Sequence, residues 1–238
     1  MPELIDVLWR ESMAPAAGRR GPRPRVSVGR VIETAVAIAD DGGLGAVSIR
    51  TLAQRLEMTP MSLYTHVDSR EDLIVLMADH VLAGLRADPA ADREKPWRAR
   101  VRQIAETNRT LLIAHSWLLE VHDPRAVLGP GAIAKYDREL AAFDGLPISD
   151  QERDAMLSYV LDFARSGAQR QLDVHSAGSL DWSRTGEQLA QRIGERYPLA
   201  QRVGAATGDE LGAAYDADAA WNFGVQRMLD GLEPILER

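Results

Sequence analysis

The stretch SIRTLAQRLEMTPMSLYTHVDSRED, residues 48–72, decides the fold, because it predicts two short helices, a tight turn between them and the start of a third helix. Apolar residues of the first helix, predicted over 48–56, recur at i, i+3, i+4 and i+7. These residues are Ile49, Leu52, Ala53 and Leu56. Ser48 stands before them as a candidate N-cap, and Glu57 and Met58 form the turn.

The second helix is predicted over residues 59–67, because Thr59 suits an N-cap and Pro60 suits the first helical position. Leu63 and Val67 lie about one turn apart and can pack inward. The residues left facing outward are Met61, Ser62, Thr65 and His66, with Tyr64 at the border. Asp68 is expected to cap the third helix.

Two short helices with small polar residues facing outward are typical of a helix-turn-helix. The major groove of DNA admits one α-helix, and side chains near the N-terminus of that helix read the base edges. The residues from 59 to 66 supply such side chains. Periodicity alone leaves an ordinary helical corner as an alternative interpretation.

The same stretch resembles the DNA-binding domain of the Tet repressor (TetR) family. The resemblance covers residues 28–85 and rests on Ser-Ile-Arg at 48–50, Leu-Ala at 52–53 and the run from 61 to 67. The Leu-Tyr-x-His-Val pattern within that run is closest to the tetracycline-repressor branch. The family often has glycine where this chain has Glu57, so the resemblance implies a conformational cost at that turn.

The resemblance implies an all-α protein with a three-helix DNA-binding head and a helical ligand-binding and dimerisation body. It assigns the expected DNA contacts to these residues: Ile49, Arg50, Pro60, Met61, Ser62, Tyr64, Thr65, His66 and Arg70. Arg50 can bind guanine bidentately, whereas Ser62, Tyr64, His66 and Arg70 suit phosphate contacts. Pro60, Met61 and Thr65 offer apolar contact to a thymine methyl group.

A basic segment, RRGPRPRV at 19–26, precedes the head. Proline disfavours helix there, so the segment is expected to be an extended arm in which Arg23 and Arg25 bind the minor groove or phosphates. A solvated basic linker is the alternative. We expect residues 1–26 to form an N-terminal extension and arm, 27–72 the head and 73–238 the body.

Two longer helices frame the head. Ser27 caps the first, predicted over 27–41, which carries one apolar stripe and ends at the glycine pair 42–43. The other, over 70–85, carries a broad stripe that predicts contact on two sides. We interpret this second helix as the mechanical connection between head and body.

Composition excludes several classes of function. The chain of 238 residues is 45% hydrophobic and has no cysteine, so no disulfide framework and no thiolate site is expected. Neither a signal peptide nor a membrane span is indicated, and we expect a cytoplasmic protein. The net charge is −7, but residues 19–70 carry eight arginines against five acidic residues. A modestly basic head on an acidic body is consistent with DNA binding.

The body, residues 96–238, shows helical periodicity, with long helices expected at 96–115, 149–174 and 217–236. A loop is expected at 175–186, then a helix that ends at Pro198, and a mobile segment at 203–217. Polar and aromatic residues on inward faces suggest a small-molecule pocket. The candidates are Asn108, His122, Tyr136, Tyr159 and Phe163, with Arg86 and Trp117 at its edge; each alternatively belongs to the core or surface.

Dimerisation is implied by the resemblance, because the tetracycline-repressor branch pairs two C-terminal helices with those of a second copy. The expected interface residues are Gly167, Ala168, Trp221, Gly224, Val225, Met228 and Gly231. The glycines permit close helix approach, which would explain their presence in helix interiors. His122 matches a metal-side histidine of that branch, but Ile104 and Asn108 replace its drug-holding amide and aromatic residues. Tetracycline-magnesium is therefore not the expected ligand, and no metal, cofactor or catalytic site is predicted.

These observations predict a homodimeric transcriptional repressor that binds a palindromic DNA operator and is released by a small-molecule effector. One alternative is a helical small-molecule-binding or catalytic protein whose head mediates protein contacts. Another is a ligand-dependent activator with the same DNA-binding dimer.

Overall fold

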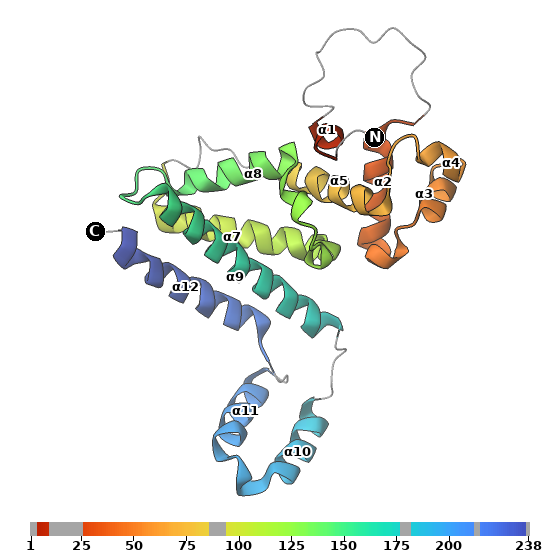
Figure 1. Ribbon diagram of the computed structural model, residues 1–238. Helices are drawn as coiled ribbons and strands as arrows, with labels where there is room; N and C mark the ends of the chain where they lie inside the picture. The colour runs from red at the N-terminus through yellow and green to blue at the C-terminus, as the bar shows by residue number, and fades with distance from the viewer. Residues whose placement is uncertain (1–3, 10–25, 86–93, 177–181, 212–214, 237–238) are drawn as a thin grey trace. The chain divides into compact units, whose positions relative to one another are not determined.

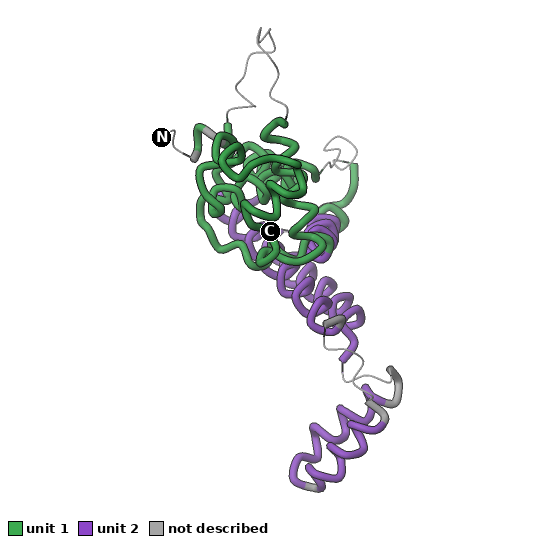
Figure 2. Tube along the Cα trace, turned by 90° about the vertical axis from the view of Figure 1, so that its right-hand side faces the viewer, with its two compact units in different colours: residues 1–100, 114–145 green, residues 101–113, 146–238 purple. Residues whose placement is uncertain are grey.

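The computed structural model describes residues 4–9, 26–85, 94–176, 182–211 and 215–236 (Figure 1). Every regular element in those ranges is a helix, which confirms the all-α prediction. The chain divides into two compact units, residues 1–100 with 114–145 and residues 101–113 with 146–238 (Figure 2). Within the described ranges no helix is long and apolar enough to cross a membrane.

Helix α2 (Val28–Gly42) begins and ends where the sequence predicts. The Ser27 side chain accepts a hydrogen bond from the Arg30 amide at 3.2 Å. At the other end Gly43 adopts a φ of 72° and donates its N–H to the Ala39 carbonyl. The apolar stripe is buried: Val31, Ile32, Ala35, Val36, Ile38 and Ala39.

The helix-turn-helix follows as η1 (Leu44–Ala46), α3 (Ile49–Arg55) and α4 (Pro60–Leu63). Ser48 and Thr59 cap α3 and α4 as predicted. Helix α4 is shorter than the predicted helix over 59–67, because the chain continues from Tyr64 in tighter turns. There the amides of Thr65 and His66 bond to carbonyls three residues back, and the Thr65 hydroxyl also donates to the Ser62 carbonyl. Such local bonding by threonine competes with continued α-helix.

Helix α5 (Arg70–Ala83) is capped one residue later than predicted. Ser69, and not Asp68, accepts the Asp72 amide at 3.0 Å. The broad apolar stripe packs on both α2 and α8 (Pro130–Leu140), which confirms the expected contact on two sides. The buried stripe residues of α5 are Leu73, Val75, Leu76, Met77, Ala78 and Val81.

The rest of the first unit is built from short helices around α5. It contains α1 (Leu4–Trp9), the ends of α7 (Trp97–Ala114), η2 (Ser116–Glu120), η3 (Pro124–Val127), α8 and η4 (Ala141–Phe143). Glycines let the start of α8 approach α5 closely. A Cβ atom at Gly129 would collide with the Asp79 carboxyl group, and one at Gly131 with the Asp79 carbonyl and Ala83.

The second unit contains α9 (Asp150–Ser176) and α12 (Ala217–Leu236), which pack side by side, together with most of α7. The predicted capping box opens α9: the Ser149 amide donates to Glu152 at 2.9 Å, and the Glu152 amide donates to the Ser149 hydroxyl at 3.2 Å. Asp216 caps α12 by accepting the amides of Asp218 and Ala219.

Two predictions about this unit are wrong. Helix α10 (Trp182–Ile193) occupies part of the expected loop at 175–186, and η5 (Gly194–Arg196) follows it. Helix α11 (Pro198–Leu211) occupies most of the segment expected to be mobile. Pro198 stands at the first helical position and begins a helix, and the alanines that follow have high helix propensity despite Gly204 and Gly208. Residues 212–214 lie outside the described ranges.

Candidate functional site

The residues from Thr59 to Val67 form a recognition segment with separate anchoring and outward faces. Leu63 and Val67 anchor the segment, with 0% and 3% of their surfaces exposed. Met61 is 76% exposed and Tyr64 is 50% exposed, although both are large apolar side chains. Two large side chains exposed one helical turn apart give an outward face that is suited to binding another surface.

The predicted DNA contacts divide by exposure. The exposed residues are Arg50, Pro60, Met61, Tyr64 and Thr65, and the half-buried ones are Ile49, Ser62, His66 and Arg70. The Ser62 and Thr59 hydroxyls lie 2.9 Å apart at the N-terminus of α4, so they fix each other's orientation. Arg23 and Arg25 lie outside the described residues. The individual DNA contacts stay predictions.

Arg70 has a structural role that the sequence did not reveal. Its Nε donates to the Val47 carbonyl at 3.0 Å, and its Nη2 donates to the Leu44 carbonyl at 2.6 Å. These bonds tie the first turn of α5 to the segment before α3. The expected phosphate contact by Arg70 must therefore coexist with two bonds inside the head.

The turn between α3 and α4 contains a strained residue, Glu57. Its φ is 53°, and it is the one non-glycine residue with a positive φ in the described part of the chain. The Met58 amide donates to the Ala53 carbonyl and the Glu57 amide to the Gln54 carbonyl. This is a Schellman C-cap, in which glycine normally occupies the position of Glu57. The cost that the resemblance implied is therefore present in the backbone.

Replacement of Glu57 with glycine is expected to stabilise the head by about 1 kcal/mol, because glycine adopts the left-handed conformation without a Cβ clash. Glu57→Gln is the matched control, since it removes the same charge and keeps the strain. Thermal denaturation should show a higher Tm for Glu57→Gly alone, and DNA titration should show tighter binding for both variants. Equal Tm values for the two variants would contradict the assignment of strain.

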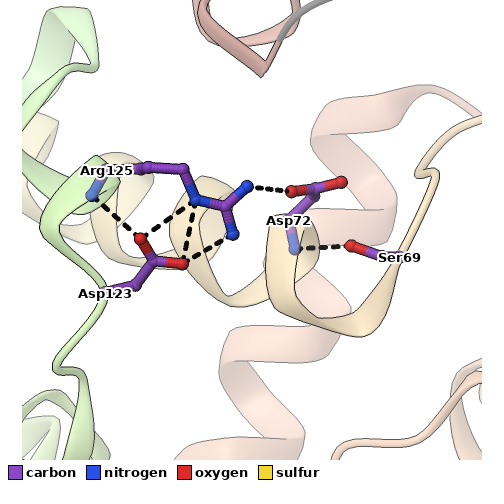
Figure 3. A network of polar contacts seen from close by, with 4 residues as sticks. All are labelled: Ser69, Asp72, Asp123 and Arg125. Carbon is purple, nitrogen blue, oxygen red and sulfur yellow. Dashed lines mark hydrogen bonds and ion pairs between the residues drawn. The ribbon is translucent and has the colours of Figure 1, made fainter. Parts of the chain in front are cut away.

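A charged network connects α5 to the segment 115–127 within the first unit (Figure 3). Arg125 donates from Nη1 to Asp72 at 2.9 Å and from Nη2 to Asp123 at 2.6 Å. Hydrogen bonds from Arg125 hold the pKa of Asp123 below its usual value, and Asp123 in turn raises the pKa of the guanidinium. The Ser69 hydroxyl accepts a hydrogen bond from the Asp72 amide at 3.0 Å, which fixes the backbone of Asp72. The network therefore joins η3 to the first turn of α5.

A second connection reaches the other end of the same segment. Oδ1 of Asp40, near the end of α2, accepts the Trp117 indole N–H at 2.8 Å and lies 2.8 Å from His115 Nδ1. Trp117 is fully buried and this bond fixes its ring, so its expected place at the edge of a pocket stays a prediction. Segment 115–127 thus contacts the head at the end of α2 and at the start of α5.

The predicted effector residues do not share one environment. Asn108 is buried and donates to the Ile104 carbonyl at 2.9 Å, as a side chain bonded back to its own helix does. Phe163 stacks on Trp221 with ring centroids 4.9 Å apart. His122, Tyr136 and Tyr159 are exposed in one chain, against the expectation that they face inward. On α8 the reason is that Gly131 and Lys135 form the buried face, which turns Tyr136 outward.

These residues are also distributed over both compact units. Trp117, His122 and Tyr136 belong to the first, whereas Asn108, Tyr159 and Phe163 belong to the second. Arg86 lies outside the described residues. A common effector pocket therefore stays a prediction.

The glycines of α9 and α12 pack within one chain. A Cβ atom at Gly167 would lie 2.5 Å from the Trp221 ring, and one at Gly224 would lie 2.7 Å from the Phe163 ring. Ala168, Trp221, Val225 and Met228 are buried without a second copy. The close approach that we expected between subunits is therefore explained between α9 and α12 of the same chain, and Gly231 alone among these glycines has open space around it.

The structure reveals a different exposed surface on these helices. Phe223 on α12 is 70% exposed, and Tyr159 on α9 is also exposed. The signal for Phe223 was present in the sequence, because this aromatic residue falls outside the apolar stripe that includes Trp221 and Val225. No sequence signal identified Asp40, Asp72 and Arg125, because their partners are far away along the chain.

Comparison with known proteins agrees with this geometry. The family described as "Tetracyclin repressor-like, C-terminal domain" matches residues 89–236. The HTH-type transcriptional repressor DrrR1 of Streptomyces coeruleorubidus is 32% identical over 98% of this chain and 85% of its own length. The tetracycline repressor protein class E of Escherichia coli is 29% identical over 38% of this chain and 43% of its own.

Solved structures show the same fold. The TetR family protein ActR of Streptomyces coelicolor, in complex with actinorhodin, superposes with a TM-score of 0.71 at 23% identity. The match covers 90% of this chain and 100% of ActR. At this level of identity the similarity concerns the fold alone.

Proposed function

Because the chain belongs to the TetR family of helix-turn-helix regulators, we propose that it is a transcriptional repressor released from its operator by a small-molecule effector. The observation that carries the proposal is the recognition segment, whose anchors are buried while Met61 and Tyr64 face outward. We assign residues 27–72 to the DNA-binding head and 73–238 to the body. We also propose that it acts in the cytoplasm, as a protein that binds operator DNA would.

The outward face of the recognition segment fits the major groove. A single helical turn with a threonine cap presents its first residues to the base edges, and the exposed Arg50 at the start of α3 can bind guanine. A dimer with two-fold symmetry would place two heads about 34–36 Å apart, in successive major grooves. The operator would then be palindromic.

Effector response requires a body whose conformations bind the effector with different affinities. Segment 115–127 is suited to transmit the difference, because Asp40 ties it to the end of α2 and Asp72 ties it to the start of α5. Displacement of this segment would pull on α2 and α5 together. The actinorhodin bound to ActR supports a small organic molecule as the effector of this chain.

The function can be tested with DNA from the region upstream of the protein's own gene. Fluorescence anisotropy should show binding that weakens with salt and discriminates against unrelated DNA. Arg50→Ala should lower this discrimination by about 5- to 150-fold, the equivalent of about 1–3 kcal/mol for a bidentate guanine contact. Arg55→Ala is the control, since it removes the same charge from the same helix and should weaken binding to both DNAs equally.

Binding that is equally weak for every DNA would contradict the function and favour a helical ligand-binding or catalytic protein. Discrimination that survives Arg50→Ala would contradict the assigned contact. Activation in place of repression would appear as higher reporter expression when the protein is present.

We further propose that the repressor is a homodimer joined through the exposed faces of α9 and α12. Phe223, Arg227 and Gly231 recur every four residues on α12 and lie on one exposed side. Gly231 weakens the helix by about 1 kcal/mol without an intrachain contact that requires it. A second copy packed against this side would explain both the 70% exposure of Phe223, whose only ring contact among the described residues is with Arg227, and the glycine.

Phe223→Glu is expected to convert the dimer to a monomer, because the new carboxylate would have to leave water at the position where the second copy is expected to cover the phenylalanine ring. The fold of one chain should survive, since the introduced charge stands four residues before Arg227, a favourable helical spacing. Light scattering after size exclusion measures the mass. Thr107→Glu, at an exposed position of α7, should remain dimeric. A dimeric Phe223→Glu protein would exclude this interface.

A further inference from the structure

Helix α1 has a defined position in the fold although it has only six residues (Figure 1). It packs on α5, and its Leu8 side chain is 6% exposed. The Trp9 indole N–H donates to the Leu128 carbonyl at 2.8 Å. A helix of this length is unstable by itself in water, so α1 depends on these contacts for its structure.

The Trp9 hydrogen bond reaches the junction between η3 and α8, which we define as residues 128–132. The opposite end of this junction is held by α5, because the buried Asp79 carboxylate accepts the Ala132 amide at 2.8 Å. Burial raises the pKa of Asp79 in spite of its backbone hydrogen bonds, as expected where water is excluded. Gly129 and Gly131 complete the contact, since neither position has room for a side chain.

Two elements therefore hold the junction by its backbone. Trp9 of α1 bonds to a carbonyl at its start, and Asp79 of α5 bonds to an amide at its end. The charged network of Arg125 stands immediately before it and connects the same region to Asp72. Helix α1 thus contacts the junction at which two glycines allow α8 to approach α5 closely.

We propose that α1 is a latch, a segment of the chain that docks on α5 and the junction and restrains the movement of α8 against α5. This rests on the proposed function, in which α5 connects the head to the effector-responsive body. The latch opposes any change that moves the Leu128 carbonyl away from α5, since that change breaks the hydrogen bond from Trp9 to Leu128 and exposes Leu8 to solvent. A passive cover over apolar surface would exert no such restraint on the junction.

Hydrogen exchange of the full-length protein distinguishes the latch from a passive cover. Trp9→Phe removes the indole donor and retains an aromatic ring, and Leu8→Ser removes the buried apolar side chain of α1. Ile5→Ser is the matched control, because Ile5 lies on the same helix and is 44% exposed. Exchange at residues 128–133 should accelerate about three- to tenfold in Trp9→Phe, the range expected for one lost hydrogen bond, and remain unchanged in Ile5→Ser.

A second measurement connects the latch to DNA binding. For the DNA upstream of the protein's own gene, the Kd of Leu8→Ser should differ from that of the unaltered protein at least threefold, while Ile5→Ser stays within twofold. If Leu8→Ser fails to fold, Trp9→Phe decides both measurements. Unchanged exchange at 128–133 in Trp9→Phe would overturn the latch. If no DNA binds selectively, the proposed function fails, while the exchange result still decides whether α1 restrains the junction.

Discussion

Trp221→Ala is expected to lower the free energy of unfolding by about 3–5 kcal/mol, the range for deleting a large buried aromatic side chain. The ring is 7% exposed and lies between helices of the second unit. Phe163 stacks on it at 4.9 Å with an interplanar angle of 25°, and the Arg109 guanidinium carbon lies 4.7 Å from its centroid. Gly167 fits against its edge. Alanine would leave a cavity and remove the side chain through which α12 contacts Phe163 of α9 and Arg109 of α7.

Urea denaturation followed by circular dichroism measures this loss. Phe223→Ala is the matched control on the same helix, and with its side chain 70% exposed it should change stability by less than about 0.5 kcal/mol in the monomeric state. Trp221→Phe should lie between the two, because it keeps a ring against Phe163 and loses volume. A loss below 1 kcal/mol in Trp221→Ala would show that the second unit does not depend on this residue.

Leu63→Ala is expected to abolish operator binding through local unfolding of the head, with a loss of about 2–5 kcal/mol. Leu63 is 0% exposed and is the buried anchor of α4, which has only four residues. A small head has little other core to compensate. Since only the folded head binds DNA, the apparent Kd rises by the factor by which the folded fraction falls.

Met61→Ala is the control on the same helix. Its side chain is 76% exposed, so the substitution should leave hydrogen exchange of residues 49–67 unchanged while it weakens DNA binding. Leu63→Ala should instead accelerate that exchange and leave α9 and α12 protected, because they belong to the second unit. Protection that is lost equally in both units would show that the head does not unfold separately.

Local sequence signals were sufficient for the helix-turn-helix. The caps at Ser27, Ser48 and Thr59 were predicted correctly, because each depends on a side chain and an amide three residues away. The apolar stripe of α2 and the capping box of α9 were predictable for the same reason. The early end of α4 was not, since a threonine hydroxyl bonded to the Ser62 carbonyl there.

Distant partners explain the candidate site residues that the sequence could not place. Arg70 was expected on phosphate, but the carbonyls of Leu44 and Val47 approach it only after folding. Trp117 was expected near ligand, yet Asp40, 77 positions earlier, accepts its indole N–H. The glycines of α9 and α12 indicated close approach, and periodicity could not tell whether the neighbouring helix belongs to the same chain.

The recognition segment uses different side chains for packing and for its outward face, which affects how its DNA specificity can be changed. Leu63 and Val67 maintain its shape, while Met61 and Tyr64 are 76% and 50% exposed. Exchanging the outward residues should therefore retarget the protein to other promoters at little expense in folding. A combinatorial library restricted to positions 61 and 64 would retain mostly folded members, which makes this head a practical starting point for new genetic switches.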